Sequence, residues 1–185
     1  MSGSPELTRP LDPGTAAALI AAAGKAFEAE LTALPDMIAS WHPARGEWCV
    51  KEVVGHVVEA ERRGFAGRIR EILAAERPRL DTWDQVGVAR QRRDCDGALA
   101  DLLSELSRRR AGSVELLTAL RPEDLERGGD HVTVGYLTVR DLLHEWVHHD
   151  RNHLRQALAS VQAYVWPEMG NARRFSSGWP SRISP

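Results

Sequence analysis

The chain has 185 residues, of which 43% are hydrophobic and 27% are charged. These values are ordinary for a globular protein, so they exclude a chain that is disordered throughout, and the length favours a single domain over residues 1–185. The 24 basic and 26 acidic residues give a formal net charge of −2, so the overall charge gives no reason to expect a nucleic acid partner.

The sequence has no uninterrupted apolar run of about 18 residues, so we expect no transmembrane helix and no membrane partner. Its first residues, MSGSPELTRPLDPG, lack the basic segment followed by an apolar segment that marks an export signal. There are only two cysteines, Cys49 and Cys95, which argues against a disulfide framework. The default location is therefore cytoplasmic.

The first helix is predicted to begin directly after Asp12, because aspartate is a favoured N-cap and Pro13 suits the first helical position. The alanine-rich run 15–34 that follows has a high helix propensity. A second helix is predicted over residues 50–73. It should end near Arg77, because the residue before a proline is pushed out of the helical region.

The connection that follows, residues 77–96, is long for a compact domain, and such long connections are often functional. A third helix is predicted over residues 97–120, and the turn-rich stretch 127–138 is typical of a small hairpin. A fourth helix should begin after Thr138, because Thr138 and Asp141 match a capping box.

The fourth helix is predicted to run to residue 162. The tail, residues 163–185, is rich in proline, glycine and serine and is predicted to be non-helical. Four long helices with one long connection predict an all-α protein. It should be a four-helix bundle over residues 12–162, with a long crossover between its second and third helices.

Four histidines lie in the fourth helix, and helical geometry sorts them into two pairs, because residues four apart share a face. The pair His149/His153 falls beside the apolar stripe of this helix, and His144/His148 falls on the opposite side among arginines. The stripe consists of Leu143, Trp146, Val147, Leu154, Ala157 and Val161. His149 and His153 are therefore predicted to face the bundle interior, and the other pair the solvent.

Imidazoles inside a bundle need partners, and a metal ion is one partner for several nitrogens at once. Two histidines spaced H-x-x-x-H need a third ligand. His56 is the natural candidate, because it is the only histidine of the second helix. Its position on the helical wheel, however, lies well to one side of the apolar stripe. From the residues alone, a metal site and ordinary histidines bonded to carbonyls or acids both stay open.

Two carboxylates, Glu61 and Asp150, fall inside the apolar stripes of the second and fourth helices. Buried carboxylates are rarely unpaired, so each is expected to cap a loop, bond an indole N–H or pair with an arginine. The alternative is functional: they would orient metal ligands or accept a proton. This alternative makes Glu61 and Asp150 the candidate catalytic residues.

Two stretches resemble motifs of the DinB-like superfamily. The stretch EWCVKEVVGHVVEAE is similar to W-S-x-x-E-x-x-x-H-x-x-x-x-E, and HDRNHLRQ is similar to H-x-x-x-H-x-x-Q. The matching residues are Trp48, Glu52, His56, Glu61, His149, His153 and Gln156. The resemblance spans residues 15–162.

The sequence departs from the family pattern at Cys49, where the family often has serine. A thiol accepts hydrogen bonds poorly, so the capping box with Glu52 should be weaker. Cys49 is expected to be an inert residue of the helix start rather than a reactive thiol.

The resemblance implies a four-helix bundle that binds a divalent metal (Zn, Ni, Fe or Mn) through His56, His149 and His153. Some relatives are S-transferases or isomerases that use bacillithiol, mycothiol or glutathione, others resemble metal-dependent hydrolases, and many have no known activity. Three histidines leave a coordination position open, as catalytic sites do. The expected function is therefore a metal-dependent enzyme acting on an unknown small molecule, with thiol transfer ahead of hydrolysis.

Two alternatives stay open: a non-enzymatic metal-binding stress-response protein, and a purely structural bundle. We also expect a homodimer, because bundles of this class often pair through helix faces and six tryptophans can supply an interface. These are Trp41, Trp48, Trp83, Trp146, Trp166 and Trp179.

Overall fold

The structure is a computed structural model that describes residues 9–176. Its α-helices are α1 (Pro13–Leu31), α2 (Asp36–Ala39), α3 (Val50–Glu59), α4 (Ala66–Ala74), α5 (Gln85–Arg92), α6 (Leu99–Thr118) and α7 (Val139–Val165). Its strands are β1 (Arg79–Leu80), β2 (Gly128–His131) and β3 (Gly135–Thr138). Tighter or wider helical turns are η1 (Ala60–Phe65), η2 (Asp94–Asp96), η3 (Pro122–Glu126) and η4 (Trp166–Ser176).

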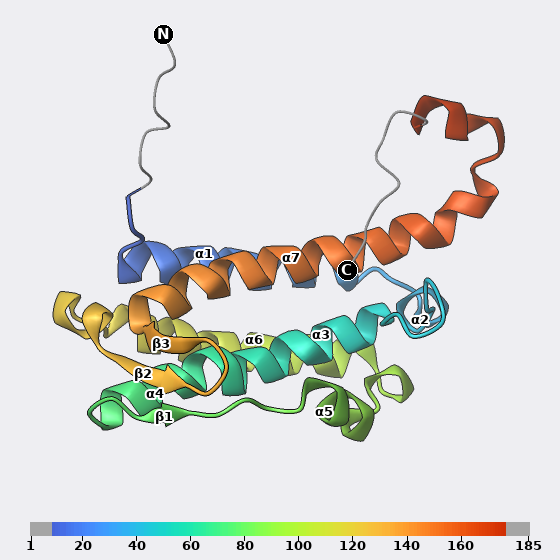
Figure 1. Ribbon diagram of the computed structural model, residues 1–185. Helices are drawn as coiled ribbons and strands as arrows, with labels where there is room; N and C mark the ends of the chain where they lie inside the picture. The colour runs from blue at the N-terminus through green and yellow to red at the C-terminus, as the bar shows by residue number, and fades with distance from the viewer. Residues whose placement is uncertain (1–8, 177–185) are drawn as a thin grey trace, which may run out of the picture.

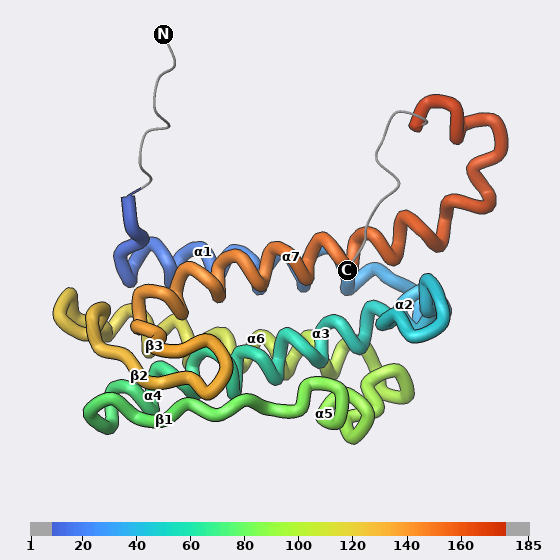
Figure 2. The backbone as a smooth tube through the Cα atoms, viewed as in Figure 1, coloured from blue at the N-terminus to red at the C-terminus, as the bar shows by residue number. Residues whose placement is uncertain are grey.

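Four long helical segments form a bundle, namely α1, the α3–α4 segment, α6 and α7 (Figure 1). α1 packs against α6 and α7, and α3 packs against the same two helices, so α1 and α3 lie at opposite corners. The chain runs along α3 and α6 in the same direction, because the crossover between them first returns it along the bundle (Figure 2). The predicted bundle, with a long crossover after its second helix, is confirmed.

The second long helix is continuous from Val50 to Ala74, because α3, η1 and α4 follow one another without a break. The η1 segment is a π-helical turn, and such turns are frequent at functional sites. Here Glu61 and Phe65 are both buried. In α3 every residue except Glu52 is buried, so this helix has no solvent face of the kind that an amphipathic pattern assumes.

The crossover between α4 and α6 contains structure that the sequence did not predict. It includes β1 and α5, and no residue of α5 is buried, which explains why no apolar periodicity predicted this helix. The predicted hairpin is confirmed as β2 and β3, which pair antiparallel with Gly128 opposite Thr138. β1 pairs with β2 in parallel, giving a three-stranded sheet in the order β1-β2-β3.

The predicted starts of the first and last helices are confirmed. Asp12 accepts a hydrogen bond from the Thr15 N–H at 2.9 Å, and Pro13 opens α1. At the start of α7, the Asp141 carboxylate accepts from the Thr138 N–H at 2.9 Å, which is one half of the predicted capping box. These caps fix where α7, which carries the histidine cluster, begins.

The prediction of a non-helical tail from residue 163 is wrong as far as the structure describes the tail. α7 continues to Val165, and in its last turn Tyr164 packs edge-on against Trp41, with the ring centroids 5.4 Å apart. The turns of η4 follow and project beyond the bundle (Figure 1). The remainder of the tail, with Trp179, lies outside the described residues.

The sequence argument against a disulfide is also wrong, because Cys49 and Cys95 are bonded to each other. They lie 46 residues apart in the chain and meet because η2, at the end of the crossover, packs on the start of α3. A cysteine count carries no information on that contact. The cytoplasmic location was expected partly because no disulfide was expected, and the Cys49–Cys95 disulfide removes that reason. Among the described residues, no helix is both long and apolar enough to cross a membrane.

Candidate metal centre

Three histidines from two helices converge at one point of the bundle. His149 and His153 come from successive turns of α7, and His56 comes from α3, which packs against α7. One ring nitrogen from each histidine lies within 4.8 Å of the other two. The Nε2 atoms of His56 and His149 are 3.1 Å apart. Two ligands of a tetrahedral ion with metal–nitrogen bonds of about 2.0–2.1 Å would be about 3.3 Å apart, so this spacing suits a shared ion.

The predicted inward orientation of His149 and His153 is confirmed, and the position of His56, left open by the helical wheel, is resolved. His56 is only 7% exposed although it lies off the apolar stripe of α3. The rings of Trp48 and Trp83 cover it, with centroids 4.9 and 5.9 Å from its own centroid. Trp83 belongs to the crossover, so the crossover buries a side of α3 that a bare bundle would leave open.

The other two histidines of α7 face away from this cluster, but the prediction that both face solvent is correct only for His148. His148 is exposed, and His144 is partly buried by the segment that precedes α1. The Leu11 N–H donates to His144 Nε2 at 3.1 Å, and His144 Nδ1 lies 2.8 Å from the carbonyl oxygen of Arg140. Both ring nitrogens of His144 are therefore engaged in holding the chain, and neither is available to a metal at the cluster.

Burial keeps two of the clustered histidines, His56 and His153, neutral. Burial first, and then the neighbouring rings of His153 and His149, lower the pKa of His56 to about 3. Burial and the ring of His149 lower the pKa of His153 to about 4, although Gln156 acts in the opposite direction. Near pH 7 both rings are therefore unprotonated, which is the form of imidazole that binds a metal ion.

One ring of the cluster is held in a fixed orientation. His153 Nδ1 lies 2.8 Å from Gln156 Oε1, so the ring donates its N–H there and leaves the lone pair on Nε2. Metal-bound histidines usually show this arrangement. Among the described residues, the three rings form hydrogen bonds with one another and with Gln156, and none with a carboxylate. Three imidazole nitrogens that converge in this way are a donor set that fits a divalent metal ion.

The two candidate catalytic acids, Glu61 and Asp150, both pair with Arg110 of α6. Arg110 Nη1 contacts Asp150 Oδ2, and Arg110 Nη2 lies 3.0 Å from Glu61 Oε2. Burial raises the pKa of Glu61, and the Arg110 charge opposes that rise. The structure thus realises the pairing with an arginine that was one of the expectations, and the catalytic role of the two acids stays a prediction.

Sequence reasoning did not single out Arg110, although a signal was present. The buried positions of α6 recur with helical periodicity, and Arg110 falls between Leu106 and Leu117 on that apolar face. Its guanidinium also donates to the carbonyl oxygen of Ile20 in α1 at 2.9 Å. An arginine that lies on the apolar face of one helix and has acidic partners on two other helices is the mark of a buried ion pair.

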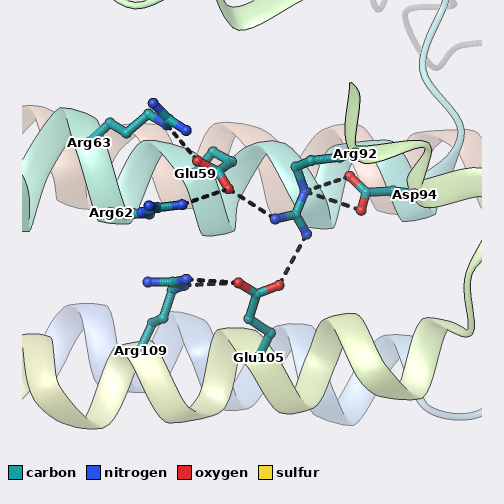
Figure 3. Close-up of polar contacts among 7 residues, drawn as sticks. All are labelled: Glu59, Arg62, Arg63, Arg92, Asp94, Glu105 and Arg109. Atoms are coloured by element: carbon teal, nitrogen blue, oxygen red, sulfur yellow. Dashed lines mark hydrogen bonds and ion pairs between the residues drawn. The ribbon is translucent and has the colours of Figure 1, made fainter. Parts of the chain in front are cut away.

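A second polar network holds the crossover against the bundle (Figure 3). Arg92 of α5 pairs with Glu59 of α3 at 3.0 Å, with Asp94 at 3.0 Å and with Glu105 of α6 at 3.1 Å. Glu59 also pairs with Arg63 on its own helix at 2.6 Å. Since α5 has no buried residue, these ion pairs are a main attachment of the crossover next to His56.

The cavity beside the histidine cluster is small. Its volume is about 10 Å³, and His56, Trp83 and residues of α5 line it. That is room for about one water molecule. A larger cavity of about 510 Å³ lies on the outer side of α7, where Arg9, His144 and His148 are among the lining residues, and it does not include the cluster.

Comparisons with known proteins agree with this architecture. A family model of the DinB superfamily matches residues 19–157. YfiT from Bacillus subtilis, described as a probable metal-dependent hydrolase with an unusual four-helix bundle topology, superposes with a TM-score of 0.76 at 16% identity, covering 88% of this chain and 92% of that one. TT2238, described as a four-helix bundle protein, superposes with a TM-score of 0.57 at 23% identity, covering 78% of this chain and 96% of that one. No curated protein matches significantly.

At these identities the two solved structures show the fold alone. The family match spans most of the chain and includes all three residues of the cluster, His56, His149 and His153. The sequence motifs, the bundle topology and the family match agree, and the chain belongs to the DinB superfamily.

Proposed function

We propose that the protein is a metal-dependent enzyme in which His56, His149 and His153 hold one divalent ion. The observation that carries this proposal is the convergence of three ring nitrogens within 4.8 Å of one another, with His56 buried and His149 and His153 partly buried. Three protein ligands leave at least one coordination position for water or substrate, which is typical of catalytic rather than structural sites. A donor set made only of imidazoles suits zinc, nickel or iron.

The residues around the cluster have separate parts in this proposal. Gln156 fixes the ring of His153, and Trp48 and Trp83 keep bulk water away from His56. When bound, a divalent ion lowers the pKa of a coordinated water or thiol and polarises a substrate oxygen. The crossover, attached by exposed helix α5 and the ion pairs of Arg92, is the segment that would move to admit a substrate.

Thiol transfer is the reaction class that we place first. The two candidate acids, Glu61 and Asp150, are both paired with Arg110, so neither is a ready general base for the proposed ion. A thiol, whose ordinary pKa is about 8.5, needs much less activation than water, whose pKa is about 15.7. A low-molecular-weight thiol such as bacillithiol, mycothiol or glutathione would therefore react without help from a base. Metal-dependent hydrolysis, the activity attributed to YfiT, is the second class.

Glu61 and Asp150 enter the proposal as positioning residues first and as proton acceptors second. Arg110 occupies a carboxylate oxygen of each, which opposes proton uptake. Asp150 Oδ1 lies 3.8 Å from His149 Nδ1, and both atoms are buried without a hydrogen-bond partner. A small shift of either side chain would let the Asp150 carboxylate accept the His149 N–H, which is how metal-bound histidines are commonly oriented.

A non-enzymatic metal-binding protein is the alternative that one observation favours. The cavity beside His56 has a volume of about 10 Å³, which admits water and nothing larger. The experiment that decides is incubation of the metal-loaded protein with each of the three thiols and a chlorinated aromatic electrophile, followed by mass spectrometry of the conjugate. Conjugation that is lost in His149→Ala and kept in His148→Ala supports the enzyme. Metal binding without conjugation or ester hydrolysis supports the alternative.

A further inference from the structure

A second cluster of metal-ligating side chains lies at the start of α3, away from the three histidines. It consists of His42, Cys49, Glu52 and Cys95, whose ligand atoms all lie within 4.8 Å of one another. His42 Nε2 is 3.0 Å from Glu52 Oε2 and 3.8 Å from Cys95 Sγ. Cys49 precedes His56 by seven residues, which is about 10 Å along the helix, so the two clusters are distinct.

We propose that these four residues form a redox-dependent zinc site, which binds zinc when the cysteines are reduced and is closed when they form the disulfide. Two thiolates, an imidazole and a carboxylate are ligands that zinc takes in tetrahedral sites, and thiolates favour zinc over magnesium or calcium. Reduction of the disulfide by two equivalents of a low-molecular-weight thiol yields two cysteine thiols and the disulfide of that reductant. Each cysteine thiol then releases its proton to water on binding zinc.

The two cysteines stay adjacent without the disulfide, because other contacts hold the turn that carries Cys95. The buried Lys51 ammonium donates to the carbonyl oxygens of Cys95 at 3.3 Å and Gly97 at 2.7 Å. In the same turn, Asp94 packs directly on Gly55, where any side chain would collide with its carboxylate. Reduction therefore frees two thiols that the fold keeps together, which lowers the ordering cost of binding a metal.

The local electrostatics favour thiolates at this position. Cys49 is the N-cap residue of α3, and its N–H donates to Glu52 Oε2 at 2.9 Å. The N-terminus of a long helix stabilises negative charge. Lys51 adds a positive charge at the same helix start, which the Asp36 carboxylate, 2.6 Å away, partly offsets. Cys49 itself is completely buried, but the His42 side chain is 46% exposed, so solvent and ions reach the cluster from the His42 side.

The simpler interpretation is a permanent structural disulfide beside a surface pair of His42 and Glu52. The two interpretations differ in one measurable respect, which is the zinc capacity of the reduced chain. The full-length protein is prepared metal-free in two forms, one with the disulfide intact and one reduced by a phosphine. Each form is titrated with zinc, and with cobalt(II) as a probe whose absorption reports bound thiolate.

The proposal predicts that the reduced protein binds one more zinc per chain than the oxidised protein, and that cobalt shows thiolate charge-transfer absorption only in the reduced form. Cys95→Ser, chosen because Cys95 is only partly buried, should lose both signals while its circular dichroism stays unchanged. His42→Ala should weaken the extra zinc at least about tenfold, since even residues that merely support a ligand contribute about 10–100-fold. His149→Ala should keep the extra zinc, which separates this test from the proposed function.

Equal zinc capacity in the reduced and oxidised proteins, or an unchanged extra zinc in Cys95→Ser, would overturn the proposal.

Discussion

His56 and His149 lie 93 residues apart in the chain, yet their Nε2 atoms are 3.1 Å apart. Two buried imidazole nitrogens at this distance share either one proton or one cation. The first arrangement joins the two rings by a hydrogen bond and gives the third ring, His153, no part in the contact. The second uses all three rings, and the fixed orientation of His153 by Gln156 supports it.

Replacing Gln156 with leucine should weaken metal binding without unfolding the protein. The substitution removes the oxygen that accepts the His153 N–H at 2.8 Å, so the ring loses its fixed orientation. Loss of such a supporting contact commonly lowers metal affinity about 10–100-fold. Isothermal titration with zinc measures the effect. Gln156→Glu, which keeps an accepting oxygen, is the matched control and should retain most of the affinity; equal affinities for the leucine and glutamate variants would contradict the assigned role of Gln156.

Replacing Arg110 with methionine should destabilise the protein strongly. It leaves the carboxylates of Glu61 and Asp150 buried without their cation, and breaking a buried ion pair from one side costs about 3–5 kcal/mol. The free energy of unfolding in urea measures the loss. Arg108→Met, at an exposed position two residues earlier, is the control and should cost no more than about 0.5 kcal/mol. A loss for Arg110→Met as small as that of the control would show that the three charges are not coupled.

Replacing Arg92 with leucine should loosen the crossover. Arg92 binds three carboxylates, and two of them, Glu59 and Asp94, have side chains only 5% and 6% exposed. The expected loss of unfolding free energy is about 3 kcal/mol, because both acids are left buried without this partner. Hydrogen exchange should show the gain in opening over residues 79–96 in particular. Exchange that rises evenly over the whole bundle would show that the network does not attach the crossover specifically.

The same network predicts a dependence on pH. Burial raises the pKa of Glu59, but the hydrogen bonds and charges of Arg63 and Arg92 outweigh it, so the pKa lies below its ordinary value of 4.5. A group whose pKa is depressed by folding contributes stability above its ordinary pKa, and that contribution is lost as the pH falls below about 4.5. Asp94 acts in the opposite sense, because burial raises its pKa.

A comparison of Glu59→Gln with the wild type isolates the Glu59 contribution. The free energy of unfolding in urea is measured at pH 7 and at pH 4 for both proteins. The wild type should lose more stability between these two values than the variant does, because only the wild type has a depressed Glu59 pKa to titrate. An equal loss in both proteins would mean that Glu59 is not stabilised by its arginines in the folded state.

The parts of the fold that were predictable are those that local chemistry determines. Asp12 and Thr138 start helices because their side chains accept free backbone N–H groups, and those starts are readable in the sequence. Helix α5 was not predictable, because it has no buried face and hence no periodic pattern. The Cys49–Cys95 bond depends on packing between segments far apart in the chain, which the spacing of two cysteines does not encode.

In the candidate site, too, the features set by a single helix were predictable, and those set by packing between distant segments were not. His149 and His153 were predictable as an inward pair, because one helix and one apolar stripe decide their direction. His56 was not, because a helical wheel assumes that one side of α3 faces solvent, whereas Trp83 and the crossover cover that side. The family motif supplied what the wheel lacked for His56. An arginine was one of three kinds of partner expected for Glu61 and Asp150, and in the fold that partner is Arg110.

The metal content of the purified protein tests the central claim most directly. The protein is kept oxidised, so that Cys49 and Cys95 bind no ion, and is analysed by inductively coupled plasma mass spectrometry after loading with zinc and removal of the excess. The account predicts about one zinc per chain in the wild type and in His148→Ala, and almost none in His56→Ala or His149→Ala. A wild type that retains no metal, or a His149→Ala variant that retains as much as His148→Ala, would contradict it.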